Sequence, residues 1–166
     1  MSMRICTFNS QGLLNGTSWD YLNDLMKNND VLLIQETWLQ SSQCHLFTDN
    51  MPNVDYVAVS AMDDAVLAQR GRPHGGCSIV WKSSLCCAVE PVKCNVNRMC
   101  AVSITLPNRF KCLFCCIYMP CDTYYDQNNV DEFSNVLGEI NVLMVNQNAD
   151  SVVCAGDFNT DFRRQA

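Results

Sequence analysis

The stretch Ser151–Asn159, with the sequence SVVCAGDFN, is an apolar run that ends on small and polar residues. Its first five residues are typical of a buried strand, and Gly156, Asp157 and Asn159 follow within four positions. Open α/β sheets bind ligands beyond the carboxyl ends of their strands. The stretch therefore predicts a strand of an α/β sheet and a polar site at the end of that strand.

Three further apolar runs end in the same way. Arg4–Phe8 is followed by Asn9, Val31–Ile34 by Gln35 and Glu36, and Cys112–Ile117 by Tyr118. Strands that end at one common edge would bring these side chains together. The pattern predicts one catalytic cluster that contains Asn9, Glu36, Tyr118, Asp157 and Asn159.

The residue types in this cluster suit phosphate chemistry. Asp157 and Asn159 are two positions apart, so the strand period would place them on the same side. A carboxylate can orient or deprotonate a water, and an amide can bind a phosphoryl oxygen without repelling it. Glu36 offers a hard oxygen ligand, and Mg²⁺ takes few carboxylates because water and substrate phosphate complete its shell. Asn9 can assist the metal or hold Glu36, and the Tyr118 hydroxyl can donate to a non-bridging oxygen.

Each of these residues alone has a structural interpretation. An Asp or Asn after a strand most often caps a turn, a Tyr there is more often packed, and Glu36 alone would be a solvated acid. Their shared position at the ends of predicted strands favours a functional site.

Length and composition limit the class of protein. A chain of 166 residues, 48% apolar and 17% charged, predicts one globular domain over residues 1–166. The net charge of −6 argues against a simple electrostatic nucleic-acid binder, although a bound divalent cation would reverse the local sign. The sequence contains neither a membrane-length apolar run nor a signal-peptide pattern, so we expect no membrane partner and a nuclear or cytoplasmic, non-secreted protein.

Twelve cysteines suggest either a metal or disulfide framework or small buried hydrophobic residues. The spacing of Cys112, Cys115, Cys116 and Cys121 lacks a second CxxC pair, and the chain has only two histidines. Several cysteines lie inside strand-like runs: Cys6, Cys77, Cys100, Cys112 and Cys154. We therefore expect the cysteines to be reduced and mostly buried.

Hydrophobic periodicity predicts two main helices and a strand meander. In the first helix Thr17 or Ser18 would cap the start, Asp20 would lie in the first turn, and the buried stripe would be Trp19, Leu22, Leu25 and Met26. The second helix would span Val130 to Asn146, with Asp131 and Glu132 in its first turn and a stripe of Val130, Phe133, Leu137, Ile140 and Met144. Further strands are expected at 56–60 and, as a meander, at 77–81, 88–90, 100–106 and 112–118.

Five motifs, in order along the chain, together resemble the endonuclease/exonuclease/phosphatase superfamily. They are TFNSQGL (7–13), QETW (35–38), GRPHGG (71–76), YMP (118–120) and GDFN (156–159). Within that superfamily, the sequence is most similar to the apurinic-type endonuclease domain of non-LTR (LINE-type) retrotransposons. The GRPxGG segment and the QETW box carry this closer likeness, which extends over essentially the whole chain.

The resemblance implies a DNase I-like, four-layered α/β sandwich and Mg²⁺- or Mn²⁺-dependent hydrolysis of a DNA phosphodiester. By matched position, Glu36 would be the metal ligand with Asn9 beside it, and Tyr118 would contact the scissile phosphate. Asp157 would orient the attacking water, and Asn159 would stabilise the phosphoryl oxygens. Arg72 and His74 would serve structure or contact the DNA backbone.

One departure from the family pattern concerns the end of the chain. Family members carry a later Asp and a Ser-Asp-His box after GDFN, whereas this sequence ends at Ala166 and neither His45 nor His74 lies in such a box. We expect a C-terminally truncated domain with an incomplete second sheet and an exposed strand edge, inactive or weakly active as it stands. The alternatives are a phosphatase of the same superfamily, a non-catalytic remnant or binding fragment, and a zinc-binding module.

Overall fold

The computed structural model describes residues 2–62, 74–121 and 127–160. These residues form two four-stranded sheets, with the orders β1-β2-β4-β3 and β5-β6-β7-β8. The first sheet consists of β1 (Ile5–Asn9), β2 (Val31–Gln35), β3 (Val54–Val59) and β4 (Cys77–Lys82). The second sheet consists of β5 (Ala88–Val92), β6 (Met99–Thr105), β7 (Lys111–Tyr118) and β8 (Ser151–Asp157).

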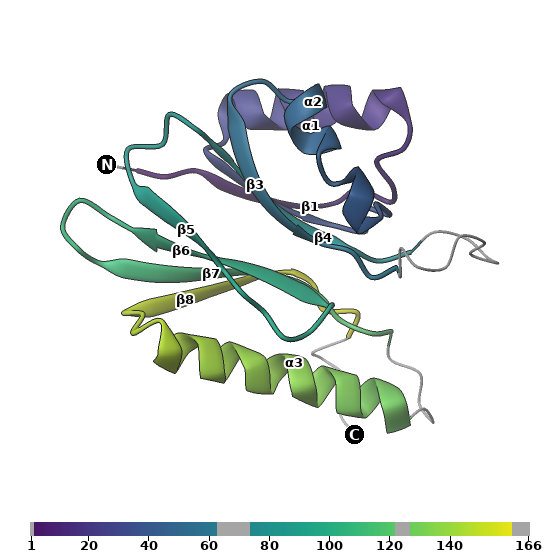
Figure 1. Ribbon diagram of the computed structural model, residues 1–166, viewed down its shortest axis with the longest axis vertical. Coiled ribbons are helices and arrows are strands. Elements are labelled where there is room, and N and C mark those ends of the chain that lie inside the picture. Colours follow the sequence, from purple (N-terminus) through teal and green to yellow (C-terminus); the bar gives the residue numbers. More distant parts are fainter. Residues whose placement is uncertain (1, 63–73, 122–126, 161–166) are drawn as a thin grey trace.

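The two sheets pack face to face, and helices cover both outer faces (Figure 1). The first sheet is covered by α1 (Gly16–Asn28) and α2 (Leu46–Asn50), the latter preceded by a short 3₁₀ turn, η1 (Ser41–Gln43). The second sheet is covered by α3 (Gln127–Asn146). This arrangement confirms the predicted four-layered α/β sandwich.

Strand β2 shows why its sequence is continuously apolar. Val31 and Leu33 belong to the core between the two sheets, whereas Leu32 and Ile34 belong to the core beneath α1 and α2. Both faces of the strand are therefore buried, as in parallel sheets that are covered on both sides.

Two parallel pairs of strands direct their carboxyl ends toward the same edge of the molecule. In the first sheet β1 runs parallel to β2, with Asn9 opposite Gln35. In the second sheet β7 runs parallel to β8, with Tyr118 opposite Asp157. Strands β1 and β8 also contact each other, so the two carboxyl ends come together across the sandwich.

The predicted meander is wrong in its first strand. β4 pairs with β2 and β3 in the first sheet, and only β5, β6 and β7 form a meander in the second. Among the described residues β8 pairs only with β7 and is half-buried along most of its length, so it is an edge strand as expected.

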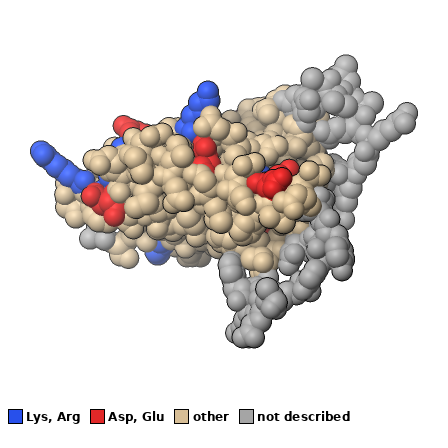
Figure 2. Space-filling model, turned by 90° about the horizontal axis from the view of Figure 1, so that it is seen from below, with Lys and Arg blue, Asp and Glu red and all other residues tan. Residues whose placement is uncertain are grey.

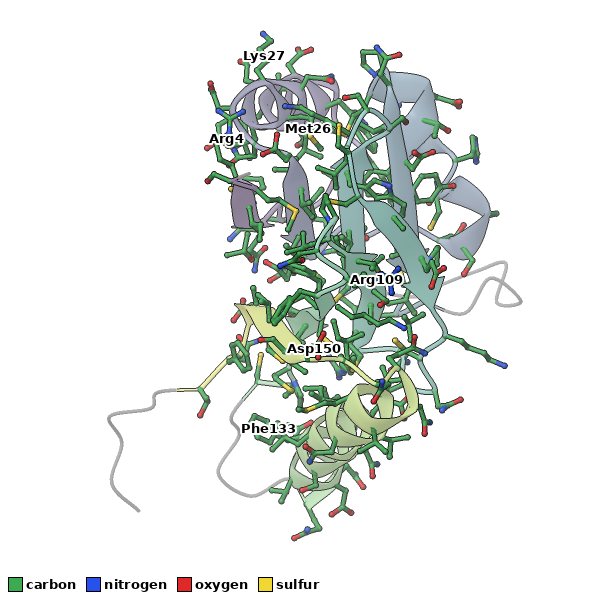
Figure 3. All side chains as sticks on the ribbon, turned by 90° about the vertical axis from the view of Figure 1, so that its left-hand side faces the viewer. Arg4, Met26, Lys27, Arg109, Phe133 and Asp150 are labelled. Atoms are coloured by element: carbon green, nitrogen blue, oxygen red, sulfur yellow. The ribbon has the colours of Figure 1, made fainter. Side chains whose placement is uncertain are left out.

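Helix α1 confirms its predicted buried stripe but not its predicted cap. Trp19, Leu22 and Met26 are buried, and Figure 3 shows Met26 toward the first sheet and Lys27 away from it. The cap is Asn15, whose side-chain oxygen accepts a hydrogen bond from the Ser18 amide at 3.0 Å. The helix therefore begins earlier than predicted, and its first turn contains no acidic residue.

Helix α3 confirms its predicted buried stripe only in part, because Phe133 and Ile140 are partly buried against the core while the fully buried face is rotated from the predicted one. Its buried positions are Val136, Glu139 and Leu143, while Val130 is 56% exposed. The predicted positions Leu137 and Met144 are also exposed, and no acidic residue lies in the first turn because the helix begins at Gln127. The Glu139 carboxylate accepts a hydrogen bond from the Asn95 amide at 2.8 Å, which stabilises a buried acid on the face that packs on the sheet. From the α3 side, Figure 2 shows a surface with few charged groups.

All twelve cysteines are free thiols, so the structure contains no disulfide framework. Five are buried, which fits their role as small hydrophobic residues. Cys154 is exposed, together with Cys86 and Cys121, so "mostly buried" is wrong for these three positions. Cys154 lies on the edge strand β8, whose side chains are only partly covered.

Candidate active site

Asn9 joins the two halves of the site. Its side-chain nitrogen, Nδ2, donates to Glu36 Oε1 at 2.8 Å and to Asp157 Oδ2 at 2.9 Å. Glu36 follows β2 in the first sheet, and Asp157 ends β8 in the second. One amide group therefore links two carboxylates that are 121 positions apart in the sequence, which brings together three of the predicted site residues.

Local hydrogen bonds fix the direction of these side chains. The Asn9 Oδ1 atom accepts from the Gln11 amide at 3.2 Å, which orients the carboxamide. The other Asp157 oxygen, Oδ1, accepts from the Asn159 amide at 3.0 Å. Asp157 thus stabilises the turn after β8, as its structural interpretation predicts, while its other oxygen faces Asn9.

Asn159 reaches the site by a different route from the one its spacing suggested. The strand ends at Asp157, and the Asn159 backbone is left-handed with φ of +47°. Strand alternation therefore does not extend to Asn159. Its side-chain nitrogen donates to the Met119 carbonyl at 2.8 Å, so it bridges the segments after β7 and after β8.

Tyr118 is half-buried beside the carboxylates. Burial is the main reason that the pKa of its phenol is raised, and the negative charges of Glu36, Cys121 and Asp157 add to the effect. A hydrogen bond with the Asn159 side chain opposes the rise without cancelling it. The phenol therefore stays protonated at neutral pH and can donate a hydrogen bond.

Arg98 is a neighbour of the site to which sequence reasoning gave no role. Its guanidinium carbon lies 5.9 Å from the centroid of the Tyr118 ring, and its carbonyl accepts from the Tyr118 amide at 2.9 Å. Its Nη2 is 2.7 Å from Glu132 Oε2 on α3. A lone arginine just before a predicted strand of the meander was the only available signal.

An open hollow of about 450 Å³ lies between the carboxyl ends of the strands. It is lined by Thr7, Phe8, Asn9, Gln35, Gly156, Asp157, Phe158, Asn159 and Thr160. Gln35 is 2% exposed and donates to Cys116 Sγ at 3.1 Å and to the Leu33 carbonyl at 3.0 Å. Its amide is therefore satisfied inside the protein, and Gln35 forms part of the floor.

The donor set fits a hard divalent cation. Glu36 and Asp157 supply carboxylate oxygens next to the Asn9 side chain, and Mg²⁺ commonly binds one or two carboxylates together with water. Within the described ranges no group of three His, Cys, Asp or Glu side chains could hold a metal ion. A zinc site of several cysteines or histidines therefore has no counterpart in this part of the chain.

The two predicted DNA contacts are placed only in part. Arg72 lies outside the described residues. His74 is exposed and directly precedes Gly75, where an added Cβ would lie 3.9 Å from the Tyr118 ring. No helix within the described ranges is long and apolar enough to cross a membrane.

Comparisons with known proteins agree with this arrangement. The sequence model of the Endonuclease/Exonuclease/phosphatase family matches residues 6–165. The AP endonuclease LMAP from Leishmania major superposes with a TM-score of 0.71 at 15% identity, covering 93% of this chain and 54% of that chain. The endonuclease domain of TRAS1, a telomere-specific non-LTR retrotransposon, gives a TM-score of 0.66 at 14% identity, covering 97% and 62%. The 3′ phosphatase NExo from Neisseria, bound to a product DNA hairpin, gives 0.61 at 16%, covering 95% and 58%.

No curated protein matches the sequence significantly. The chain spans about half to two thirds of the length of these solved chains. The sandwich and its polar edge define a DNase I-like fold. The match over residues 6–165 shows that the chain belongs to the endonuclease/exonuclease/phosphatase family.

Proposed function

We propose that this chain is a DNA-nicking endonuclease domain of the retrotransposon type that hydrolyses a phosphodiester with Mg²⁺ or Mn²⁺. The observation that carries the proposal is the pair of hydrogen bonds from Asn9 Nδ2 to Glu36 and Asp157. They hold two carboxylates from different sheets on one amide group, and Asn9 and Asp157 line an open hollow. Divalent-metal dependence is a property of the family, which supports the choice of cofactor.

Each site residue has a defined task in this proposal. Glu36 holds the metal, with Asn9 beside it; the cation, when bound, neutralises charge on the phosphate. Asp157 orients the attacking water with the oxygen that faces Asn9. The protonated Tyr118 phenol donates to a non-bridging oxygen, and Asn159 stabilises the phosphoryl group from the neighbouring turn.

The choice of DNA as substrate rests on the structural neighbours. Two of them are described as an AP endonuclease and a retrotransposon endonuclease domain. A phosphatase acting on a small phosphomonoester is a second candidate, because another neighbour is described as a 3′ phosphatase. Parallel assays on supercoiled plasmid and on small phosphomonoesters separate the two activities.

We also propose that residues 1–166 on their own nick DNA weakly. No Lys, Arg or His is found among the described residues that line the hollow. Stabilisation of phosphate charge would then depend on the metal and on neutral donors, and a missing charge-stabilising group typically costs about 10²–10³ in rate. DNA binding should also be weak because the net charge is −6.

The test is nicking of supercoiled plasmid at low salt with Mg²⁺. Glu36→Ala and Asp157→Ala are compared with the parent chain and with Asp20→Ala, which removes one negative charge from the exposed surface of α1. We expect slow nicking that the first two substitutions abolish and the third leaves unchanged. Nicking that survives Glu36→Ala and Asp157→Ala would reject the assigned site.

A chain with no catalytic role is distinguished by metal binding. A cation that binds only the folded state must raise the melting temperature. A folded chain that neither nicks DNA nor melts at a higher temperature with Mg²⁺ would be a non-catalytic remnant or a binding fragment, against the proposal.

A further inference from the structure

The backbone at the predicted metal ligand is unusual. Glu36 and Trp38 are both left-handed, with φ of +53° and +55°. Non-glycine residues adopt this region at a cost of about 1–3 kcal/mol each and keep it only where their surroundings enforce it. The direction of the Glu36 side chain therefore depends on whatever holds this turn.

Backbone hydrogen bonds hold the turn from two sides. On one side the amides of Gly12 and Leu13 donate to the carbonyls of Glu36 at 2.8 Å and of Thr37 at 3.1 Å. On the other side the amides of Thr37 and Trp38 donate to the carbonyls of Gly76 at 3.3 Å and of Gly75 at 3.0 Å. The turn is thus clamped between residues 12–13 and the Gly75–Gly76 pair.

The clamp has no room for side chains at the two glycines. A Cβ at Gly76, where φ is +85°, would lie 2.4 Å from Thr37 Oγ1. A Cβ at Gly75, where φ is +66°, would lie 2.6 Å from the Ala61 Cβ and 3.9 Å from the Tyr118 ring. Thr37 is 2% exposed, so it cannot simply turn outward into solvent.

We propose that the Gly75–Gly76 pair is a positioning element that fixes the left-handed turn at Glu36 and thereby sets the affinity for the divalent cation. The inference rests on the proposed function, in which Glu36 holds the metal. It gives the GG end of the GRPHGG segment a defined role at the site. It also links that segment to Tyr118, whose ring lies beside Gly75.

The experiment compares glycine-to-alanine substitutions at crowded and open positions. Gly76→Ala and Gly75→Ala are matched with Gly138→Ala, because nothing lies within 4 Å of a Cβ added at Gly138 on α3. Two quantities are measured on folded protein without DNA: Mg²⁺ affinity by calorimetry, and the backbone conformation of Glu36 from its Cα and Cβ chemical shifts. The second measurement does not depend on metal or on activity.

We expect Gly76→Ala to weaken Mg²⁺ binding by about 10–100-fold, the usual effect of losing a group that orients a ligand. The Glu36 shifts should leave the left-handed range, while Gly138→Ala changes neither quantity. A merely structural role would lower stability without changing the affinity of the folded protein. Parent-like Glu36 shifts and parent-like affinity in folded Gly76→Ala would overturn the inference.

Two variants cover the remaining outcomes. If Gly76→Ala does not fold, Gly75→Ala, whose new methyl group would meet the Ala61 side chain, is judged by the same criteria. Thr37→Ala keeps both glycine carbonyls and should retain affinity. If the parent chain binds no Mg²⁺, the proposed metal site fails, and the Glu36 shifts alone decide whether the glycine pair positions the turn.

Discussion

The first sheet and the second sheet each supply half of the candidate active site, but they hold their halves differently. Glu36 follows β2, whose five residues are all buried, and its turn is hydrogen bonded on both sides. Asp157 ends β8, an edge strand in the described structure that is half-buried and pairs only with β7. The half with Glu36 is thus fixed within its own sheet, whereas the position of Asp157 depends on one strand pairing and on its hydrogen bonds with Asn9 and Asn159.

Because β8 is held by fewer contacts than β2, a substitution in β8 should disrupt the site most readily. Among the substitutions below, Gly156→Ala should have the largest effect on stability. Gly156 has φ of +152°, and an added Cβ would lie 1.9 Å from the Ile117 carbonyl oxygen on β7. The pairing of the two strands would have to open at the residue before Asp157. We expect a loss of more than about 3 kcal/mol in the free energy of unfolding, measured in urea.

Gly138→Ala is the matched control for this substitution. Gly138 is exposed in α3 with open space around it, so alanine should stabilise the helix by about 0.5–1 kcal/mol. Equal stabilities of the two variants would show that β8 can move away from β7 without cost, and would remove the basis of the comparison.

Asn9→Ala tests the link between the halves and should have the second largest effect. It removes two hydrogen bonds to carboxylates and leaves Glu36 and Asp157 without their shared donor. Because hydrogen bonds to charged groups are each worth about 1.5–3 kcal/mol, and this site is partly exposed, we expect a metal-free loss of about 2 kcal/mol.

The control for Asn9 is Asn23→Ala. Asn23 donates one side-chain hydrogen bond to the Asn50 carbonyl at an exposed position, and its loss should cost about 0.5 kcal/mol. Urea unfolding without metal measures both variants. A loss at Asn9 no larger than that at Asn23 would mean that the two halves are held independently of each other.

Arg98→Ala examines the support behind Tyr118 and should have a smaller effect. The ion pair with Glu132 and the contact with the Tyr118 ring are both partly exposed, so their joint contribution should be about 1 kcal/mol. A double-mutant cycle with Glu132→Ala isolates the pair. A coupling energy of zero would leave the ring contact as the only interaction of the Arg98 side chain that stabilises this part of the site.

The sequence was sufficient to predict that the candidate site lies at the ends of the strands. Parallel strands bring their carboxyl ends to the same edge of a sheet, whichever other strands they pair with. It failed where a contact distant in sequence decides the outcome. Helix α3 has two apolar stripes, and the buried one includes Glu139, whose partner Asn95 is 44 positions away. The spacing of Asp157 and Asn159 could not show that β8 stops at Asp157.

The same limit applies to the assignment of β4 and to Arg98. β4 lies next to β5 in the sequence, yet it pairs with β2 and β3, because its apolar residues are needed on both faces of the first sheet. The position of Arg98 against Tyr118 depends on the pairing of β6 with β7 and on Glu132 from α3. None of these partners is specified by local periodicity.

The smallest effect on the site itself should come from Asp30, at the opposite end of β2 from Glu36. Its Oδ2 accepts from the Arg4 amide at 2.8 Å, and its Oδ1 lies 3.5 Å from Lys82 Nζ. The hydrogen bond from the Arg4 amide is the main reason that the pKa of Asp30 is lowered below 3.8; burial opposes it, and the charges of Arg4 and Lys82 support it. A carboxylate whose pKa is lower in the folded state stabilises the protein above its unfolded pKa, and this stability is lost as the pH falls through the folded value.

Asp30→Asn should therefore lower the free energy of unfolding by about 1 kcal/mol at pH 7. The difference from the parent chain should shrink as the pH falls below 3.8, because the parent carboxyl then becomes protonated and loses its charge. Urea unfolding at pH 7 and pH 3 measures the difference, with Asp24→Asn on the exposed face of α1 as the control. Because Asp30 precedes the fully buried strand β2 and Glu36 follows it, Mg²⁺ affinity should not change. A loss of affinity in Asp30→Asn would mean that the first sheet transmits a disturbance along β2, and that its half of the site is less firmly held than its hydrogen bonds suggest.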